Sequence, residues 1–306
     1  MRKLSFDAEK LLDTYKAPFS MKYGSGSDAC KQAGYAEDAN PMVDLVFGTE
    51  NTQAWHEVLM HTNPQDYSLI ARMLGIKGIE WLQPKGACIY YHPYVDFEGH
   101  EIKYGIISLE DLKKDLTEWI TLYCAGRLHK PVEILRATTD VRWAIQENLS
   151  HALSAALLIL PKHFTPQELF MTIAGLSYTG DTRMKHGENP DKVKNIVLKN
   201  ENAFAELYKD VIARRWDILQ CVDGDRFEQN KSPEKQAMIF SQLPRNLRKK
   251  TEFIENPNAI AENIQIAIAD IVRGPSLSQS LKGVISAGPI KSWRYLKEKR
   301  AKAKAA

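Results

Sequence analysis

The stretch Met42-Val43-Asp44-Leu45-Val46-Phe47-Gly48 decides the fold class of this chain of 306 residues. Its β-branched and aromatic residues predict a buried strand, and Gly48 predicts the turn that ends it. Asp44 stands out, because a carboxylate among apolar residues is costly to bury unless it is paired or bound to a metal ion. On an edge strand it can instead face water. The stretch therefore predicts a strand of a sheet and points to Asp44 as a candidate site residue.

A glycine-rich turn precedes this strand. Tyr23-Gly24-Ser25-Gly26-Ser27 follows a short extended run at 18–22, and Asp44 comes eighteen residues after Gly26. Glycines let the backbone approach phosphate groups closely, and the Ser25 hydroxyl can bind phosphate oxygens. Many such turns are only turns. With Asp44 on the adjacent strand, the pattern favours a site that binds a nucleoside triphosphate through the glycine-serine turn and Mg²⁺ through the carboxylate.

This layout resembles the polymerase-beta-like nucleotidyltransferases, in which a strand and a Gly-Ser turn are followed by a strand bearing acids. That superfamily usually places a second acid two residues along, where this chain has Val46. Mg²⁺ can rely on one or two protein carboxylates together with substrate phosphates. Candidates for the remaining ligand are Asp38, Glu50 and Asp181.

The rest of the chain predicts a mixed fold, α/β or α+β. Hydrophobic periodicity and turn signals predict helices at 52–61, 108–126 and 141–160 and from Thr165, and strands at 87–95, 101–107 and 131–135. The two strands at 87–107 are close enough to form a hairpin. Thr165-Pro166-Gln167-Glu168 has the order of a capping box with a proline in the first turn.

The length predicts at least two cores, since domains usually run about 100–200 residues. We expect a nucleotidyltransferase domain at 1–107, a helical domain at 108–219 and a C-terminal region at 220–306. Helix, strand and two helices in the second segment are compatible with a winged-helix module, and with other small helical domains. The polar, turn-rich stretch at 220–235 predicts a linker or an excursion from the domain.

Composition excludes several classes. The chain is 44% apolar and 26% charged, as in ordinary globular proteins, and no apolar run approaches the roughly 20 residues that cross a bilayer. Its four cysteines are widely separated, which suggests neither a zinc site nor a disulfide framework. The first residues lack the arginine-rich, acid-poor composition of an import signal.

The C-terminal tail is strongly basic. Seven Lys or Arg stand against one acid at 291–304, and Ile290, Trp293 and Leu296 fall on one helical stripe among them. This pattern predicts a basic amphipathic helix at about 288–306 that lies on an anionic membrane surface. The alternative is a solvated terminal helix.

Several longer phrases resemble one family, the mitochondrial-type phosphatidate cytidylyltransferases, also known as translocator assembly and maintenance proteins. They occur in the family's order from about Ser20 to Lys291. The phrases are Gly24-Ser25-Gly26, Met42-Val43-Asp44-Leu45-Val46-Phe47-Gly48, Ile102-Lys103-Tyr104-Gly105-Ile106-Ile107-Ser108, Ala125-Gly126-Arg127-Leu128-His129-Lys130-Pro131, Ile173-Ala174-Gly175-Leu176-Ser177-Tyr178-Thr179-Gly180-Asp181, Lys192-Val193-Lys194-Asn195-Ile196-Val197, Ile271-Val272-Arg273-Gly274-Pro275-Ser276 and Gln279-Ser280-Leu281-Lys282-Gly283.

The resemblance implies an enzyme that makes CDP-diacylglycerol and pyrophosphate from CTP and phosphatidic acid with Mg²⁺, and so feeds cardiolipin and phosphatidylglycerol synthesis. It implies a nucleotidyltransferase domain joined to a winged-helix domain. It also implies peripheral attachment to the matrix side of the mitochondrial inner membrane; without an import signal, the cytoplasmic face of a bacterial membrane is the alternative.

The same resemblance suggests roles for individual residues. Asp44 and Ser25 are the predicted catalytic residues, with Asp44 as metal ligand. Predicted contacts to CTP or the lipid phosphate come from the glycine turn and from more distant residues, namely Gly24, Ser25, Gly26, Lys103, Arg127, Lys130, Asp181 and Lys192. From the residues alone, Arg127 and Lys130 can equally complement a helix dipole, and Asp181 can be an ordinary cap or surface ion pair.

Two other functions use similar features. Gly-Ser turns with acids also serve nucleotidyltransferases that act on RNA, and winged helices often bind DNA. The modest net charge of +3 and the lack of an aromatic RNA-binding module argue against a nucleic-acid partner. A non-enzymatic membrane-assembly factor is the third reading, although such a factor needs neither Ser25 nor Asp44.

Overall fold

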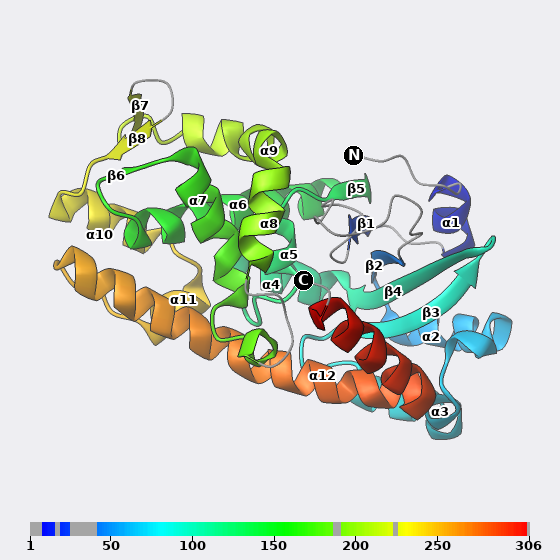
Figure 1. Cartoon of the computed structure of the whole chain (residues 1–306). Coiled ribbons are helices and arrows are strands. Elements are labelled where there is room, and N and C mark those ends of the chain that lie inside the picture. The colour runs from blue at the N-terminus through cyan, green and yellow to red at the C-terminus, as the bar shows by residue number, and fades with distance from the viewer. Residues whose placement is uncertain (1–7, 16–18, 25–41, 186–190, 223–225, 305–306) are drawn as a thin grey trace.

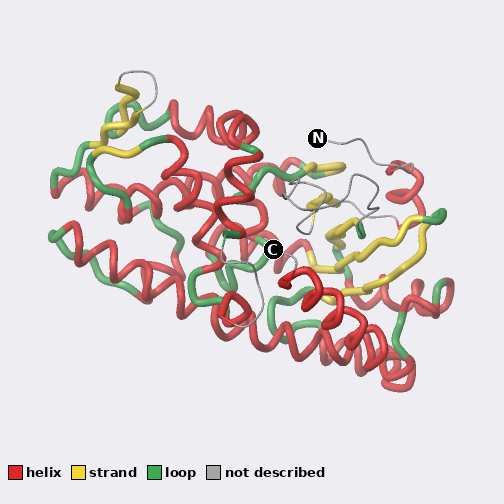
Figure 2. Tube along the Cα trace, in the orientation of Figure 1, coloured by secondary structure: helices red, strands yellow, loops and turns green. Residues whose placement is uncertain are grey.

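The protein is a mixed α/β structure, as predicted, and helices predominate in it (Figures 1 and 2). The computed structural model describes residues 8–15, 19–24, 42–185, 191–222 and 226–304. A five-stranded sheet lies in one half of the molecule and a helical bundle with a small three-stranded sheet in the other. The long C-terminal helix runs along both halves (Figure 1).

The larger sheet has the strand order β3-β4-β2-β1-β5. Its strands are β1 Phe19–Gly24, β2 Val43–Thr49, β3 Tyr90–Phe97, β4 His100–Ser108 and β5 Glu133–Arg136. β2 and β4 run parallel, and the other neighbours are antiparallel. The predicted strands and the hairpin are therefore confirmed. β5 lies beyond the predicted boundary at 107/108, yet it pairs with β1, so residues of the first two predicted segments share one sheet.

Both faces of this sheet are covered, because alternate residues of a strand point to opposite sides. Leu45 and Phe47 of β2 pack into a core with α2 (Thr52–Thr62) and α3 (Leu69–Leu82). Val46 faces the other way, into the core that it shares with α4 (Leu109–Glu118) and α6 (Thr139–Ile159). α1 (Ala8–Tyr15) adds Tyr15, whose ring stacks on Phe47 and Trp55.

The helix predicted at 108–126 is shorter than expected. Ser108 caps α4 as predicted, but the helix ends at Glu118, where Trp119 adopts a left-handed conformation with φ of 56°. The buried Asp115 carboxylate then accepts hydrogen bonds from the backbone of the loop that follows, at 2.7–3.0 Å from four N–H groups. This carboxylate organises 119–125 as a loop, which is why the helical pattern stops early.

The helical half surrounds α6. It contains α5 Ala125–Leu128, α7 Pro166–Gly175, α8 Lys192–Lys199, α9 Glu201–Ala213, α10 Pro233–Ser241 and α11 Arg245–Lys250, with short 3-10 turns η1 Pro64–Asp66, η2 Leu176–Tyr178 and η3 Thr182–Lys185 elsewhere along the chain. The predicted capping box opens α7, where Thr165 and Glu168 each accept from the other's backbone N–H.

Of the two alternatives for 220–235, the linker is wrong. β7 (Leu219–Val222) and β8 (Arg226–Gln229) form a hairpin whose second strand pairs with β6 (His163–Phe164), and α10 follows. The Phe227 ring lies 5.7 Å from that of Phe164. Few apolar residues mark these short strands, so their pairing depends on contacts with a distant segment.

α12 (Pro257–Lys304) joins the two halves. Ile264 and Ile268 pack in the helical core, whereas Gln279 and Lys282 bond to the backbone beside β3. The helix kinks at Gly288, which has φ of 77°. Across all the described residues, we find no helix with both the length and the apolar character that crossing a membrane requires.

Candidate active site

Asp44 and Lys103, both predicted site residues, lie side by side in the sheet. Asp44 sits in β2 between Tyr23 of β1 and Lys103 of β4 in the strand register. The carboxylate is 2% exposed, and its Oδ2 lies 3.8 Å from the Lys103 Nζ. The same ammonium lies 4.4 Å from the centre of the Tyr91 ring. A buried carboxylate needs such a positive neighbour, so the sheet holds the charges of this pair together.

A glycine makes room for this arrangement. Gly105 faces Tyr91 across β3 and β4, and a Cβ built on it lies only 2.7 Å from the Tyr91 ring and 2.6 Å from the Ile89 side chain. Any larger residue displaces the ring over which Lys103 lies. In the sequence, Gly105 appears only as one residue of a phrase shared with the family. The close contact shows why a glycine is needed there: it leaves room for the Tyr91 ring.

The second carboxylate oxygen of Asp44, Oδ1, is buried and has no hydrogen-bond partner among the described residues. An oxygen left in this state suits a hard cation, which prefers oxygen ligands. Of the candidates for a further ligand, Asp38 lies outside the described residues and Glu50 is exposed after β2. No cluster of three or more His, Cys, Asp or Glu able to hold a metal ion occurs in the part of the chain that the structure describes.

The predicted phosphate-binding turn begins beside Asp44. Gly24 is the last residue of β1 and pairs with Val43, next to Asp44. Ser25 and Gly26 lie outside the described residues. Because β1 and β2 are antiparallel, the chain leaves β1 at the end of the sheet where β2 begins. The register therefore places the start of the turn within one residue pair of the carboxylate.

Two further predicted cations meet at one ring. The Lys130 Nζ lies 4.9 Å from the centre of the Tyr178 ring, and the Lys192 Nζ lies 5.3 Å from it. Lys130 also donates to the Ser177 Oγ at 3.1 Å and to the Gly126 carbonyl. Two ammonium groups at one ring form a local positive charge that suits a phosphate.

Gly126 and Arg127 belong to the same junction. A Cβ on Gly126 lies 2.1 Å from the Ser177 Cβ, so α5 and η2 touch only because this residue is a glycine. Arg127 turns back on its own segment: its guanidinium lies 3.8 Å from the centre of the Tyr123 ring and donates to the Tyr123 carbonyl at 2.6 Å.

Asp181 lies against the C-terminal helix. It is 5% exposed and accepts a hydrogen bond from the Ser276 hydroxyl at 2.7 Å. The preceding Gly180 has φ of 80°, and a Cβ there lies 2.5 Å from the Ala269 carbonyl oxygen. The phrase that contains Ser177, Tyr178 and Asp181 thus links α5, the two lysines and α12.

Sequence reasoning missed the residues that position α5 and the loop before it. Asp115 organises the loop into α5, and Asn148 of α6 accepts from the Trp119 indole N–H at 2.9 Å while donating to the Ala125 carbonyl at 2.9 Å. The Asn148 Oδ1 also lies 3.1 Å from the His129 ring. A polar residue on the apolar face of a predicted helix was the signal available for Asn148.

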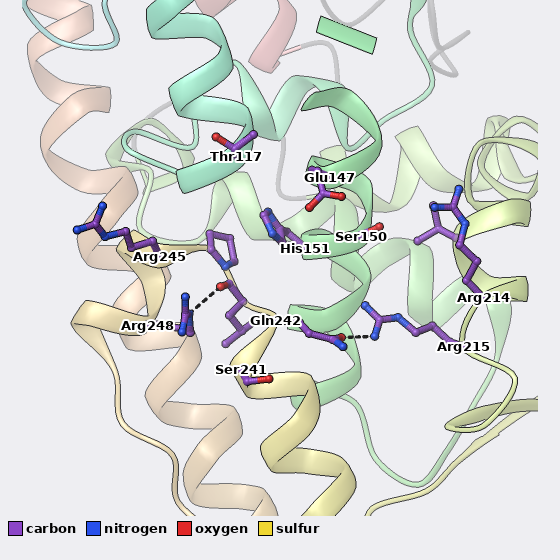
Figure 3. Close-up of a pocket in the computed structure, with 13 residues that line it drawn as sticks. Thr117, Glu147, Ser150, His151, Arg214, Arg215, Ser241, Gln242, Arg245 and Arg248 are labelled. Carbon is purple, nitrogen blue, oxygen red and sulfur yellow. Dashed lines mark hydrogen bonds between the residues drawn. The ribbon is translucent and has the colours of Figure 1, made fainter. Parts of the chain in front are cut away.

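A pocket of about 590 Å³ lies in the helical half, away from these residues (Figure 3). The turn after α9 contributes Arg215, α11 contributes Arg248, and Glu147 and His151 of α6 lie between them. Arg215 bonds to Ser154 at 3.0 Å and to the side chain of the residue after α10. These bonds tie α6, α9 and α10 together, and none of the predicted site residues lines the pocket.

The fold and these side chains define a mixed α/β protein with two groups of charged residues, of which the lysine pair suits an anionic ligand. A buried carboxylate lies beside one lysine, and two more lysines meet at a tyrosine ring.

The chain belongs to the mitochondrial phosphatidate cytidylyltransferase family. The family profile described as "Phosphatidate cytidylyltransferase, mitochondrial" matches residues 8–302. Relatives of that name include a Xenopus laevis protein, 38% identical over 316 residues that cover 96% of this chain and 93% of the relative. A Mus musculus protein is 36% identical over 95% of this chain and 92% of its own length. A Schizosaccharomyces pombe protein is 34% identical over 96% of this chain and 82% of its own length. The resemblance seen in the sequence phrases is confirmed.

Proposed function

We propose that this chain is a phosphatidate cytidylyltransferase, which converts CTP and phosphatidic acid to CDP-diacylglycerol and pyrophosphate. The observation that carries the proposal is the buried Asp44, beside Lys103 and next to the strand that ends in the glycine-serine turn. Family membership supplies the substrate class, because the relatives bear the name of this activity.

The reaction needs no nucleophile from the protein. A phosphate oxygen of phosphatidic acid attacks the α-phosphorus of CTP, and the bond from that phosphorus to the bridging oxygen breaks. Pyrophosphate leaves with the bond's electron pair. Catalysis of such a transfer consists mainly of positioning and of neutralising phosphate charge.

The chain's own residues divide this work in the proposed mechanism. The turn at Gly24, Ser25 and Gly26 binds the CTP phosphates, and Lys103 offsets charge beside Asp44. Lys130 and Lys192 suit the phosphate of the second substrate or the leaving pyrophosphate, since both lie at one ring. Arg127 and Asp181 hold the surrounding segments in position.

Asp44 is the proposed ligand of Mg²⁺, through the oxygen that lacks a partner among the described residues. When bound, Mg²⁺ supplies positive charge to the triphosphate oxygens. Ser25 and Asp44 remain the proposed catalytic residues.

We also propose the finer fold assignments. A glycine turn between antiparallel strands, with the acid on the second, supports a polymerase-beta-like nucleotidyltransferase domain. The helices and strands in the order α6, β6, α7, α8, α9, β7, β8, with sheet order β6-β8-β7, support a winged-helix-like domain. In this proposal the helical domain extends past residue 219, to the end of the β7–β8 hairpin.

We propose peripheral attachment to an anionic membrane, on the matrix side of the mitochondrial inner membrane or the cytoplasmic face of a bacterial one, in the supply of cardiolipin precursors. In the tail, Trp293 is 66% exposed. Lys291 donates to the Pro93 carbonyl at 2.9 Å, and Arg294 pairs with Glu101 at 2.9 Å, so these two cations face the β3–β4 hairpin. A chain ending at Gly288 that sediments fully with phosphatidate vesicles contradicts a role for the tail.

The first experiment follows label from radioactive CTP into lipid. Purified protein with Mg²⁺ and phosphatidic acid in mixed micelles is expected to move label into the organic phase, and EDTA or Asp44→Ala is expected to abolish this. Label that joins an RNA primer instead supports the nucleic-acid alternative, and no transfer at all supports the assembly factor.

A further inference from the structure

Several large apolar side chains of α3 and the middle of α12 are exposed to solvent. The four most exposed are Met73 at 87%, Leu281 at 71%, Leu69 at 69% and Trp81 at 67%. Four more are between 40% and 51% exposed, namely Ile70, Leu74, Leu277 and Val284. Single exposed apolar residues are ordinary, but a concentration of them on neighbouring elements marks an interaction surface.

α3 bends at Gly75, where φ is 63°, so both of its ends reach the same part of α12 and the two helices share one surface. The Ser68 hydroxyl, which caps the start of α3, donates to the Ile285 carbonyl at 3.0 Å. At the other end, the buried Lys282 Nζ donates to the Gln83 carbonyl at 2.6 Å. Figure 1 shows α3 and α12 side by side along one edge of the molecule.

The exposed residues of α12 follow the helix period. Leu277, Leu281 and Val284 are spaced four and three residues apart, so they form one stripe. Gln279 and Lys282 point the opposite way, toward the backbone beside β3. The stripe is thus the outer side of a helix whose inner side is already packed.

The charge around this surface is predominantly positive. α3 and the residues just after it carry three exposed cations, Arg72, Lys77 and Lys85. Between residues 69 and 85 the sequence has one acid, Glu80. Along α12, the sequence has no acid between Asp270 and Glu298. The Lys85 Nζ lies 5.1 Å from the centre of the Trp81 ring, so apolar and basic groups are interleaved.

We propose that this basic-apolar face, made by α3 and residues 277–284 of α12, docks on the surface of an anionic membrane. Aliphatic and tryptophan side chains bury apolar area in the lipid interface, while nearby cations attract anionic headgroups. A second copy of the chain brings the same positive charge and so complements the face poorly. The proposal rests on the proposed function in one respect, namely that phosphatidic acid is the lipid to be reached.

This face is separate from the basic tail. The tail follows the kink at Gly288, and Lys291 and Arg294 bond to the β3–β4 hairpin. Docking through α3 and α12 therefore requires no release of these tail contacts.

The test places acids on the face. Met73→Glu with Leu281→Glu is compared with Trp143→Glu with Leu198→Glu, which puts the same charges on exposed apolar positions of α6 and α8. Flotation with phosphatidylcholine vesicles, with and without phosphatidate, measures binding. We expect the face variant to bind phosphatidate vesicles more weakly by about tenfold per substitution, and the control to bind like the wild type.

Turnover separates docking from chemistry. With a short-chain phosphatidate below its micelle concentration, the face variant is expected to keep wild-type activity, and with vesicles to lose it. If the wild type forms no lipid product but the face variant still binds vesicles more weakly than the wild type, docking is supported and the proposed function fails. Vesicle binding that is the same in the face variant and the wild type overturns the proposal. If, in addition, the wild type is a dimer and the face variant a monomer, the face is an interface between two copies of the chain instead.

Discussion

Lys282 gives a stability prediction whose sign and size follow from its surroundings. Its side chain is 2% exposed, and its Nζ donates to the carbonyls of Gln83 at 2.6 Å and Lys85 at 3.1 Å. No carboxylate pairs with it among the described residues. Burial lowers the pKa of Lys282 from 10.5 to about 7, against smaller opposing effects of Cys88 and Asp111.

This lowered pKa makes folding more favourable as the pH rises. Between about pH 7 and the ordinary pKa of lysine, the unfolded chain binds a proton that the folded chain does not, so the free energy of unfolding increases with pH. Below pH 7 both states are protonated and the contribution is nearly flat. At 1.36 kcal/mol per unit, the rise from pH 6 to pH 9 is about 2–3 kcal/mol.

The assay is urea unfolding of the wild type and of Lys282→Met at pH 6 and pH 9. Groups that titrate identically in both proteins cancel in the difference, which leaves the contribution of this lysine. We expect the stability of the wild type relative to the variant to increase by about 2–3 kcal/mol between the two pH values. Lys249→Met, at an exposed position on α11, is the matched control and should show no such change. A wild-type minus Lys282→Met difference that is equal at pH 6 and pH 9 refutes the reasoning.

Three further predictions concern the site and its frame. Asp44→Asn is expected to lower turnover about a thousandfold while the circular dichroism spectrum stays the same, and near-normal turnover contradicts the metal assignment. Gly105→Ala should cost about 1–3 kcal/mol in urea unfolding because its Cβ meets the side chains of β3, whereas Gly283→Ala, with open space at its Cβ, should cost nothing. Asp115→Ala removes the acceptor of several backbone N–H groups, so we expect a loss of about 3 kcal/mol or more; a loss below about 1 kcal/mol contradicts its role in the loop.

Local signals in the sequence predicted the elements that carry their own pattern. The apolar run around Asp44, the hairpin at 87–107 and the capping box at Thr165 all depend on residues within a few positions of one another. The sequence also placed Asp44 and Lys103 in strands, but only the register shows that the two residues are neighbours.

The remaining features depend on contacts that no local sequence pattern shows, either just beyond a helix or between distant segments. α4 ends early because the Asp115 carboxylate accepts hydrogen bonds from the backbone of the loop that follows. Hydrophobic periodicity gives no sign of these bonds. The strands of the β7–β8 hairpin are stabilised by pairing with β6, about sixty residues earlier. Ser25 and Asp38 lie outside the described residues, so their predicted roles stay predictions.

α12 and β5 connect the sheet to the helical half. β5 reaches the sheet from a segment between α5 and α6, and α12 bonds to the residues after α3 through Gln279 and Lys282. Asp181 is fastened to α12 through Ser276, only a few residues before those two. The same helix therefore contacts the segment that carries the Lys130–Lys192 junction and the backbone beside the strands that carry Asp44 and its neighbours. We therefore expect a change in the position of α12 to shift the Lys130–Lys192 junction relative to Asp44 and Lys103.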